Sequence, residues 1–276
     1  MSKLVFLDVD GTLCGPTGRI PASTRQAIKQ AQANGHKMFV CTGRTKVELT
    51  EEILSLNFDG IIGAGGGYCE VGDQVLVHEV LKREEVLQLE QFFRAHQIEY
   101  YLQTHQNLFA SKHFKQQLIE SVWKKYPERA AEMLTEMSWF VDLLMYDPEL
   151  IDYDNISKIC FTNEEIPYAE IRDLFQDTFE VVPNTTVMFG KNSGEFSVKD
   201  LSKKTAIQHV LAHLAVAPEH SLGFGDSYND LPMFEAVHVG IAMGNATPEL
   251  LAAADDVTAA QDQDGIALAF AKYGLI

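Results

Sequence analysis

Two aspartates spaced one residue apart near the start of the chain could together bind a cation or move protons. Asp8 and Asp10 lie at the end of residues 3–9, a short apolar segment typical of a strand that is buried on both faces. Alternate side chains of a strand point the same way, so the two carboxylates should project together. Because like charges repel unless a cation or a proton intervenes, the pair predicts a divalent metal. The alternative is a plain acidic turn, in which Gly11 only reverses the backbone.

A hydroxyl side chain and a glycine follow the next apolar segment, residues 37–41. Thr42 and Gly43 precede an expected helix over residues 45–56. A hydroxyl beside the backbone N–H groups of a helix N-terminus makes a site for anions such as phosphate. The alternative is that Thr42 is a simple helix cap.

Acidic and amide side chains follow a later apolar segment. Asp226, Asn229 and Asp230 come directly after residues 221–225, and Lys203 begins an expected helix. In open α/β sheets, ligands bind where the carboxyl ends of the strands meet, so we expect these carboxylates to reach the same edge as the first aspartate pair. The ammonium of Lys203 could neutralise phosphate charge there, and the alternative is a solvated surface lysine.

Apolar segments typical of strands alternate with expected helices at both ends of the chain, which predicts right-handed βαβ units and a parallel sheet. Residues 82–192 interrupt this alternation and contain 17 of the 27 aromatic residues. We therefore predict an α/β protein with a Rossmann-like parallel-sheet core made of residues 1–81 and 193–276. Residues 82–192 are predicted to form an inserted α+β domain.

The composition of the 276-residue chain argues against some classes of binding partner. Its 22 basic and 39 acidic side chains give a formal net charge of −17, which argues against binding to nucleic acid or to an anionic membrane. The apolar run before Asp8 is too short for a signal peptide, and no run approaches the length of a membrane span. The four cysteines show no C-x-x-C spacing, so we expect reduced thiols and a cytoplasmic protein.

Four segments that carry these polar residues occur in the order of the motifs of the haloacid-dehalogenase-like (HAD) hydrolases, and they resemble those motifs. The resemblance is specifically to the Cof-type phosphatases, which have a large α/β cap between the second and third motifs. The resemblance covers residues 8–12, Thr-Gly-Arg at 42–44, Ser-Lys at 202–203 and residues 225–230. It implies a mobile cap and Mg²⁺-dependent hydrolysis of small phosphorylated metabolites, such as sugar phosphates. The family usually has Asn-Gly-Ala after the third strand, whereas this chain has Gly-Gly-Gly at 65–67, which leaves the identity of the substrate open.

The resemblance also implies a role for each residue at a motif position. Asp8 would be the nucleophile that forms an aspartyl-phosphate, and Asp10 would be the general acid and base. The groups that would bind Mg²⁺ are Asp8, the backbone carbonyl of Asp10, and Asp226. Those that would bind the phosphoryl oxygens are Thr42, Gly43, Lys203 and Asn229, while Asp230 would support a metal-bound water or Lys203. The alternatives are a sugar phosphomutase with the same intermediate and a non-enzymatic, phosphorylatable Mg²⁺-binding module.

Overall fold

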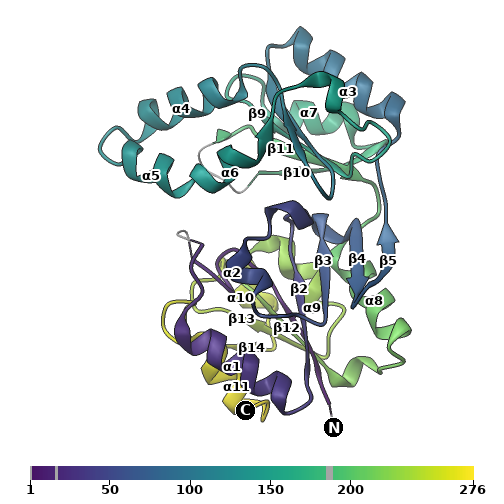
Figure 1. The fold of residues 1–276 in the computed structure, drawn as a ribbon, viewed down its shortest axis with the longest axis vertical. Coiled ribbons are helices and arrows are strands. Elements are labelled where there is room, and N and C mark those ends of the chain that lie inside the picture. The colour runs from purple at the N-terminus through teal and green to yellow at the C-terminus, as the bar shows by residue number, and fades with distance from the viewer. Residues whose placement is uncertain (1, 16–17, 185–188) are drawn as a thin grey trace. The chain divides into compact units, whose positions relative to one another are not determined.

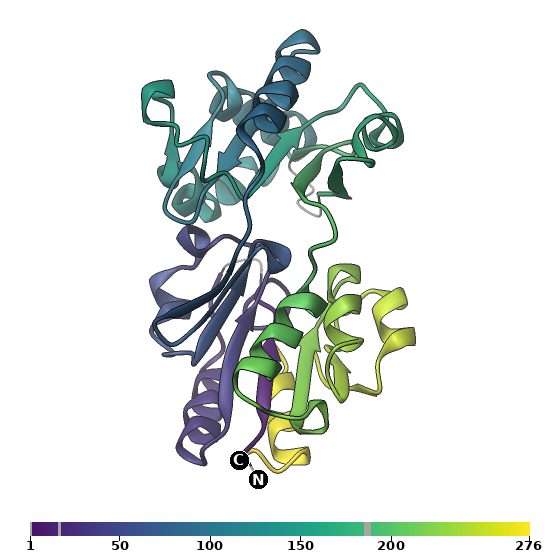
Figure 2. The same cartoon turned by 90° about the vertical axis from the view of Figure 1, so that its right-hand side faces the viewer.

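The computed structural model describes residues 2–15, 18–184 and 189–276, and these form two compact units. The first unit comprises the residues up to Arg44, Leu49–His78 and Leu201–Ile276, and the second comprises Thr45–Glu48 and Glu79–Asp200. The chain therefore leaves the first unit and later returns to it, as can be followed in Figures 1 and 2.

Within the described residues, an eight-stranded sheet forms the centre of the first unit, in the order β14-β13-β12-β1-β2-β3-β4-β5. Its strands are β1 (Leu4–Leu7), β2 (Lys37–Cys41), β3 (Gly60–Gly63), β4 (Tyr68–Val71), β5 (Gln74–His78), β12 (Ser221–Gly225), β13 (Val239–Ala242) and β14 (Asp256–Val257). Neighbours from β14 to β3 are parallel, whereas β4 and β5 form an antiparallel hairpin at one edge. This mostly parallel sheet confirms the predicted α/β fold.

Helices cover both faces of this sheet because alternate side chains of its strands point to opposite faces. The helices are α1 (Ala22–Ala33), α2 (Glu51–Leu54), α8 (Lys203–His213), α9 (Leu231–Phe234), α10 (Pro248–Ala253) and α11 (Gly265–Lys272). Val5 and Leu7 of β1 pack with α1 and α11 on one face, and Leu4 and Phe6 pack with α8 and α9 on the other. Both faces of β1 are thus buried, so a ligand can reach only the residues that follow the C-terminal end of this strand.

The described part of the second unit contains a six-stranded sheet in the order β10-β11-β9-β6-β7-β8. Its strands are β6 (Glu99–Gln103), β7 (Leu108–Ala110), β8 (Leu144–Met145), β9 (Lys158–Thr162), β10 (Phe179–Pro183) and β11 (Gly194–Val198). The helices are α3 (Arg83–Ala95) and α7 (Tyr168–Phe175), which pack on one face, and α4 (Phe114–Lys125), α5 (Ala130–Glu136) and α6 (Ser138–Leu143), which pack on the other. No helix among the described residues is both long and apolar enough to cross a membrane.

The second unit extends further toward the C-terminus than residue 192, its predicted end. Strand β11 pairs antiparallel with β9 and with β10, and Phe196 is fully buried in the aromatic core of this unit. The structure therefore divides the chain after Asp200 rather than between residues 192 and 193. The reason is physical: β11 is a strand of the second sheet, whereas the return to the first unit begins only just before α8.

Candidate active site

Asp8 directly follows β1, where the chain makes a tight turn. Its backbone N–H donates to the carbonyl of Phe224 on the neighbouring β12 (3.0 Å), and its carbonyl accepts from Leu13 (3.2 Å). Gly11 adopts a φ of +84°, and a Cβ at this position would lie 2.2 Å from Oδ2 of Asp226. Only glycine fits this close approach in the left-handed region. The turn therefore places the first aspartate pair beside the loop that follows β12.

Lys203 is buried between two carboxylates. Its Nζ donates to Oδ1 of Asp8 (2.7 Å) and to Oδ1 of Asp230 (2.6 Å), and the residue is only 2% exposed. It is the first residue of α8, which Ser202 caps. Burial by itself lowers the pKa of Lys203, but the charges of Asp230 and Asp8 outweigh it and raise that pKa above its usual value. The alternative of a solvated lysine is therefore wrong.

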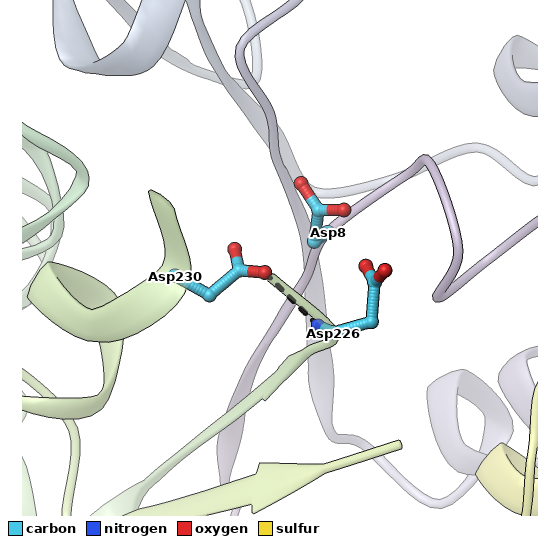
Figure 3. A group of neighbouring side chains, drawn as sticks. All are labelled: Asp8, Asp226 and Asp230. Carbon is cyan, nitrogen blue, oxygen red and sulfur yellow. Dashed lines mark hydrogen bonds between the residues drawn. The ribbon is translucent and has the colours of Figure 1, made fainter. Parts of the chain in front are cut away.

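Three carboxylates converge at this end of the sheet. One oxygen from each of Asp8, Asp226 and Asp230 lies within 4.8 Å of the others, and Figure 3 shows the three side chains grouped together. Asp230 is fully buried, and its Oδ2 accepts hydrogen bonds from the backbone N–H of Asp226 (3.0 Å) and of Ser227 (3.1 Å). The first of these bonds is the dashed line in Figure 3. Asp230 thus holds both the loop after β12 and the Lys203 ammonium.

The carboxylates repel one another in surroundings that provide little solvation. Burial, followed by the charge of Asp230, raises the pKa of Asp8 well above its usual value, although Lys203 opposes the shift. The same two causes raise the pKa of Asp226 to about 7, against a hydrogen bond donated by the Thr12 hydroxyl (3.2 Å). One lysine does not neutralise three carboxylates, so the cluster fits a divalent cation, which prefers oxygen ligands.

The raised pKa of Asp226 predicts how the stability of the metal-free protein depends on pH. Between about pH 4 and 7 the native state binds a proton that the unfolded state has lost, so stability falls as the pH rises. Raising the pH from 6 to 8 should cost roughly 1 kcal/mol, visible as a drop in the thermal midpoint measured with chelator present. Asp226→Asn should remove this part of the dependence. An unchanged slope in the variant would contradict the assignment to Asp226.

The side chain of Asp10 turns toward Arg44. Arg44 donates from Nε to Oδ2 of Asp10 (2.9 Å) and from Nη2 to Oδ1 (2.7 Å). The Asp10 side chain is 60% exposed, and that of Arg44 is 15% exposed. The sequence motif that contains Arg44 predicted no role for this residue. The available signal was its place in the same Thr-Gly-Arg segment as the expected anion site.

Thr42 and Gly43 lie at the end of β2, but the expected helix over residues 45–56 is wrong. The backbone N–H and the hydroxyl of Thr45 both donate to one carboxylate oxygen of Glu48 (2.8 and 2.9 Å), which closes a single 3₁₀ turn, Lys46–Glu48. The short helix α2 begins only at Glu51. Thr42 is buried, and its hydroxyl accepts from the Arg44 N–H (3.1 Å). A helix N-terminus therefore does not immediately follow these two residues.

Gly66, the middle one of the three glycines at 65–67, lies against the start of α8. Gly65 and Gly66 have φ values of +67° and +115°. A Cβ on Gly66 would lie 2.3 Å from the carbonyl oxygen of Ser202, the residue before Lys203. Close packing beside the buried lysine therefore explains the glycine at position 66.

Asn229 does not join the hydrogen bonds of the carboxylate cluster that the structure describes. Its side chain is exposed, and its Oδ1 accepts from the hydroxyl of Ser227 (2.6 Å). The structure thus brings Asp8, Asp226, Asp230 and Lys203 together, whereas Asn229 lies at the rim of the same loop.

Comparisons with known proteins identify the family of the chain. The family model of the haloacid dehalogenase-like hydrolases matches residues 5–270. Phosphatase YwpJ of Bacillus subtilis (strain 168) is 26% identical, over 96% of this chain and 97% of its own length. Among solved structures, the HAD subclass IIB sugar phosphatase BT4131 is 26% identical with a TM-score of 0.76. A second structure, described under the conservation of a trigonal-bipyramidal intermediate in a phosphoryl-transfer superfamily, is 27% identical with a TM-score of 0.78. Both of these matches cover 100% of both chains. The chain therefore belongs to the haloacid dehalogenase-like hydrolases and is an enzyme of the phosphatase kind.

Proposed function

We propose that this phosphatase hydrolyses phosphomonoesters of small metabolites, such as sugar phosphates, with the help of Mg²⁺ and through an aspartyl-phosphate on Asp8. The observation that carries the proposal is the buried Asp8 carboxylate, which Lys203 holds beside Asp226 and Asp230 at the end of β1. The similarity to a sugar phosphatase supports the class of substrate. The full-length family match supports the type of reaction.

Two aspartates would share the chemistry. An oxygen of Asp8 forms a bond to phosphorus while the bond from phosphorus to the leaving oxygen breaks, and Asp10 gives its proton to that oxygen. Asp10 then takes a proton from water as the water oxygen attacks the phosphorus. The bond from phosphorus to Asp8 breaks, which releases inorganic phosphate and regenerates the carboxylate. For either transfer, Asp10 has to loosen its contact with Arg44, which engages both of its oxygens.

The remaining residues would balance charge around the phosphoryl group. Lys203 would bind phosphoryl oxygens while Asp230 keeps its ammonium in place, with Thr42, Gly43 and Asn229 as further polar contacts. The residues that would hold Mg²⁺ are Asp8, Asp226 and, by its backbone carbonyl, Asp10. Bound Mg²⁺ would supply positive charge that neutralises the phosphoryl oxygens.

The second unit would serve as a cap that selects the leaving group. It has its own sheet and its own aromatic core, so it can change substrate preference without disturbing the carboxylate cluster of the first unit. We therefore assign the chemistry to the first unit and the selection of substrate to Glu79–Asp200.

The metal requirement gives the direct test of the proposal. Activity on p-nitrophenyl phosphate should fall to background in excess chelator and return when Mg²⁺ is added, because Asp8 and Asp226 repel each other without a cation. Excess Ca²⁺ should inhibit, since it takes more ligands at longer distances than Mg²⁺. Circular dichroism in chelator provides the control for folding. Full activity in excess chelator would refute the metal role of Asp226.

A second assay distinguishes hydrolysis from a phosphomutase reaction, in which the phosphoryl group returns to the substrate. With Mg²⁺ present, a panel of sugar phosphates, nucleotides, flavin mononucleotide and pyridoxal phosphate should release inorganic phosphate, the sugar phosphates fastest. A sugar bisphosphate that was isomerised without release of phosphate would instead identify a phosphomutase.

A further inference from the structure

One short segment makes contact with both loops that carry the site's carboxylates. This segment, residues 243–247, follows β13 at the same edge of the sheet. The side-chain Nδ2 of Asn245 donates to the carbonyl oxygen of Gly11 (2.9 Å), the residue after Asp10. The backbone N–H of Thr247 donates to the carbonyl oxygen of Asp226 (2.8 Å). The segment therefore joins the loop after β1 to the loop after β12.

The segment is itself anchored to rigid parts of the first unit. The N–H of Met243 donates to Gly225 at the end of β12 (2.9 Å), and the N–H of Gly244 donates to Ala259 (3.1 Å). A Cβ on Gly244 would lie 2.7 Å from the backbone nitrogen of Ala260, so the two backbones are in close contact. Asn245 thus projects from a fixed base toward the Asp10 loop.

Both Oδ1 and Nδ2 of the Asn245 carboxamide make hydrogen bonds. Its Oδ1 accepts from the backbone N–H of Gln261 (3.0 Å), which orients the amide so that Nδ2 faces Gly11. The side chain of Gln261 in turn lies against the same loop, where a Cβ on Gly15 would be 2.5 Å from its Nε2. A carboxamide can donate at one end and accept at the other, which is what these two bonds require.

Asn245 bonds to Gly11, the residue of the turn whose backbone is the least restrained. Gly11 has a positive φ and no side chain, so its backbone is less restrained than that of its neighbours. Its own N–H bonds to Cys14 within the same loop (2.8 Å), whereas the bond from Asn245 ties the loop to a different element. Losing this bond would free the peptide that follows Asp10 to move relative to Asp226.

We propose that Asn245 is a positioning residue that holds the Asp10 loop in register with the Asp226 loop, and thereby keeps the metal-binding oxygens at the correct separation. The part that concerns the metal rests on the proposed function. The part that concerns the loop does not, because it depends only on hydrogen bonds within the first unit.

The matched control is Asn34, which makes the same kind of bond just before the start of β2, at the opposite end of the parallel strands from Asp8. Its Nδ2 donates to the carbonyl oxygen of Leu275 (2.8 Å), where the chain after α1 meets the C-terminus. Asn34→Asp and Asn245→Asp each exchange a donor for an acceptor with almost no change in volume. Asn245→Asp retains the acceptor for Gln261, so it removes the bond to Gly11 selectively.

The experiment compares the wild-type protein, Asn245→Asp, Asn245→Ala and Asn34→Asp. Hydrogen exchange by mass spectrometry on the metal-free proteins should show residues 8–14 exchanging about three- to tenfold faster in both Asn245 variants, and unchanged in Asn34→Asp. Calorimetric titration with Mg²⁺ should show binding weakened about three- to tenfold in the Asn245 variants only. Saturating Mg²⁺ should then restore kcat, whereas damage to the reacting groups would not be rescued.

The direction of the change in Mg²⁺ affinity in Asn245→Asp distinguishes the proposal from a simple effect of charge. A new negative charge beside the cluster would by itself attract Mg²⁺, so tighter binding in this variant would overturn the proposal. Unchanged exchange of residues 8–14 would overturn it as well. A wild-type protein that binds no Mg²⁺ would refute the proposed function instead, and the exchange comparison would then decide on Asn245 by itself.

Discussion

Asp8→Asn is expected to reduce phosphatase activity at least about 10³-fold while the protein stays folded. The substitution removes the proposed nucleophile and leaves the shape of the side chain unchanged. Burial and the charge of Asp230 already disfavour the ionised form of Asp8 by raising its pKa, so a neutral amide suits this environment. We therefore expect a change of less than about 1 kcal/mol in the free energy of unfolding. Steady-state kinetics and thermal melts measure the two effects.

A matched control is available in the same unit. Asp59 also pairs with a lysine, Lys37 (3.0 Å), and its carboxylate accepts from the backbone N–H of Met38 (2.9 Å). Asp59→Asn should keep wild-type activity. Beryllium fluoride should bind stoichiometrically to the wild-type protein and to Asp59→Asn, but not to Asp8→Asn. An Asp8→Asn protein with more than a tenth of wild-type activity would show that Asp8 is not the nucleophile.

Lys203→Met is expected to damage both stability and activity. It leaves Asp8 and Asp230 buried without their shared ammonium, and removing one partner from a buried ion pair costs about 3–5 kcal/mol. Loss of a cation that stabilises the phosphoryl oxygens should lower kcat about 100-fold or more. Denaturant unfolding in chelator and kinetics at saturating Mg²⁺ measure the two effects separately.

The next residue along α8 is the control for this variant. Lys204 pairs with Glu235 at the surface (2.9 Å), and both of these side chains are at least 40% exposed. Lys204→Met should therefore change the free energy of unfolding by less than about 1 kcal/mol and leave kcat unchanged. Equal losses of stability in Lys203→Met and Lys204→Met would mean that the buried ion pairs do not stabilise the fold. If Lys203→Met does not fold, Lys203→Arg tests the charge without leaving the carboxylates unpaired.

Much of the first unit could be predicted because its signals are local. The strands are short apolar runs, and a polar residue directly after such a run has to lie at the edge of the sheet. That logic alone placed Asp8 and Asp226 at one site, although they are far apart in the chain. The order of the motifs was sufficient to indicate the family, because each motif is a short stretch whose residues act together.

Tertiary structure decided which groups are actually in contact. Whether Lys203 was solvated or buried depended on how α8 packs, and no residue near it in sequence revealed that it lies between Asp8 and Asp230. The bond from Asn245 to Gly11 joins residues 234 positions apart, and a lone asparagine in a loop carries no pattern that predicts it. Local structure was also misjudged where a side chain competed with the backbone: Thr45 and Glu48 close a single turn where a longer helix was expected.

The C-terminal limit of the second unit was likewise decided by tertiary contacts and not by local sequence. Strand β11 has the sequence Gly-Glu-Phe-Ser-Val, an alternation of apolar and polar residues that is typical of a half-buried strand, but such a pattern does not reveal which sheet the strand joins. Pairing with β9 and burial of Phe196 settle that question, because backbone hydrogen bonds and packing form between segments that meet only in the folded chain. The sequence by itself therefore determined the strands that carry the site, the residue types there and the family. The folded chain decided their partners, because burial and pairing are properties of neighbours in space.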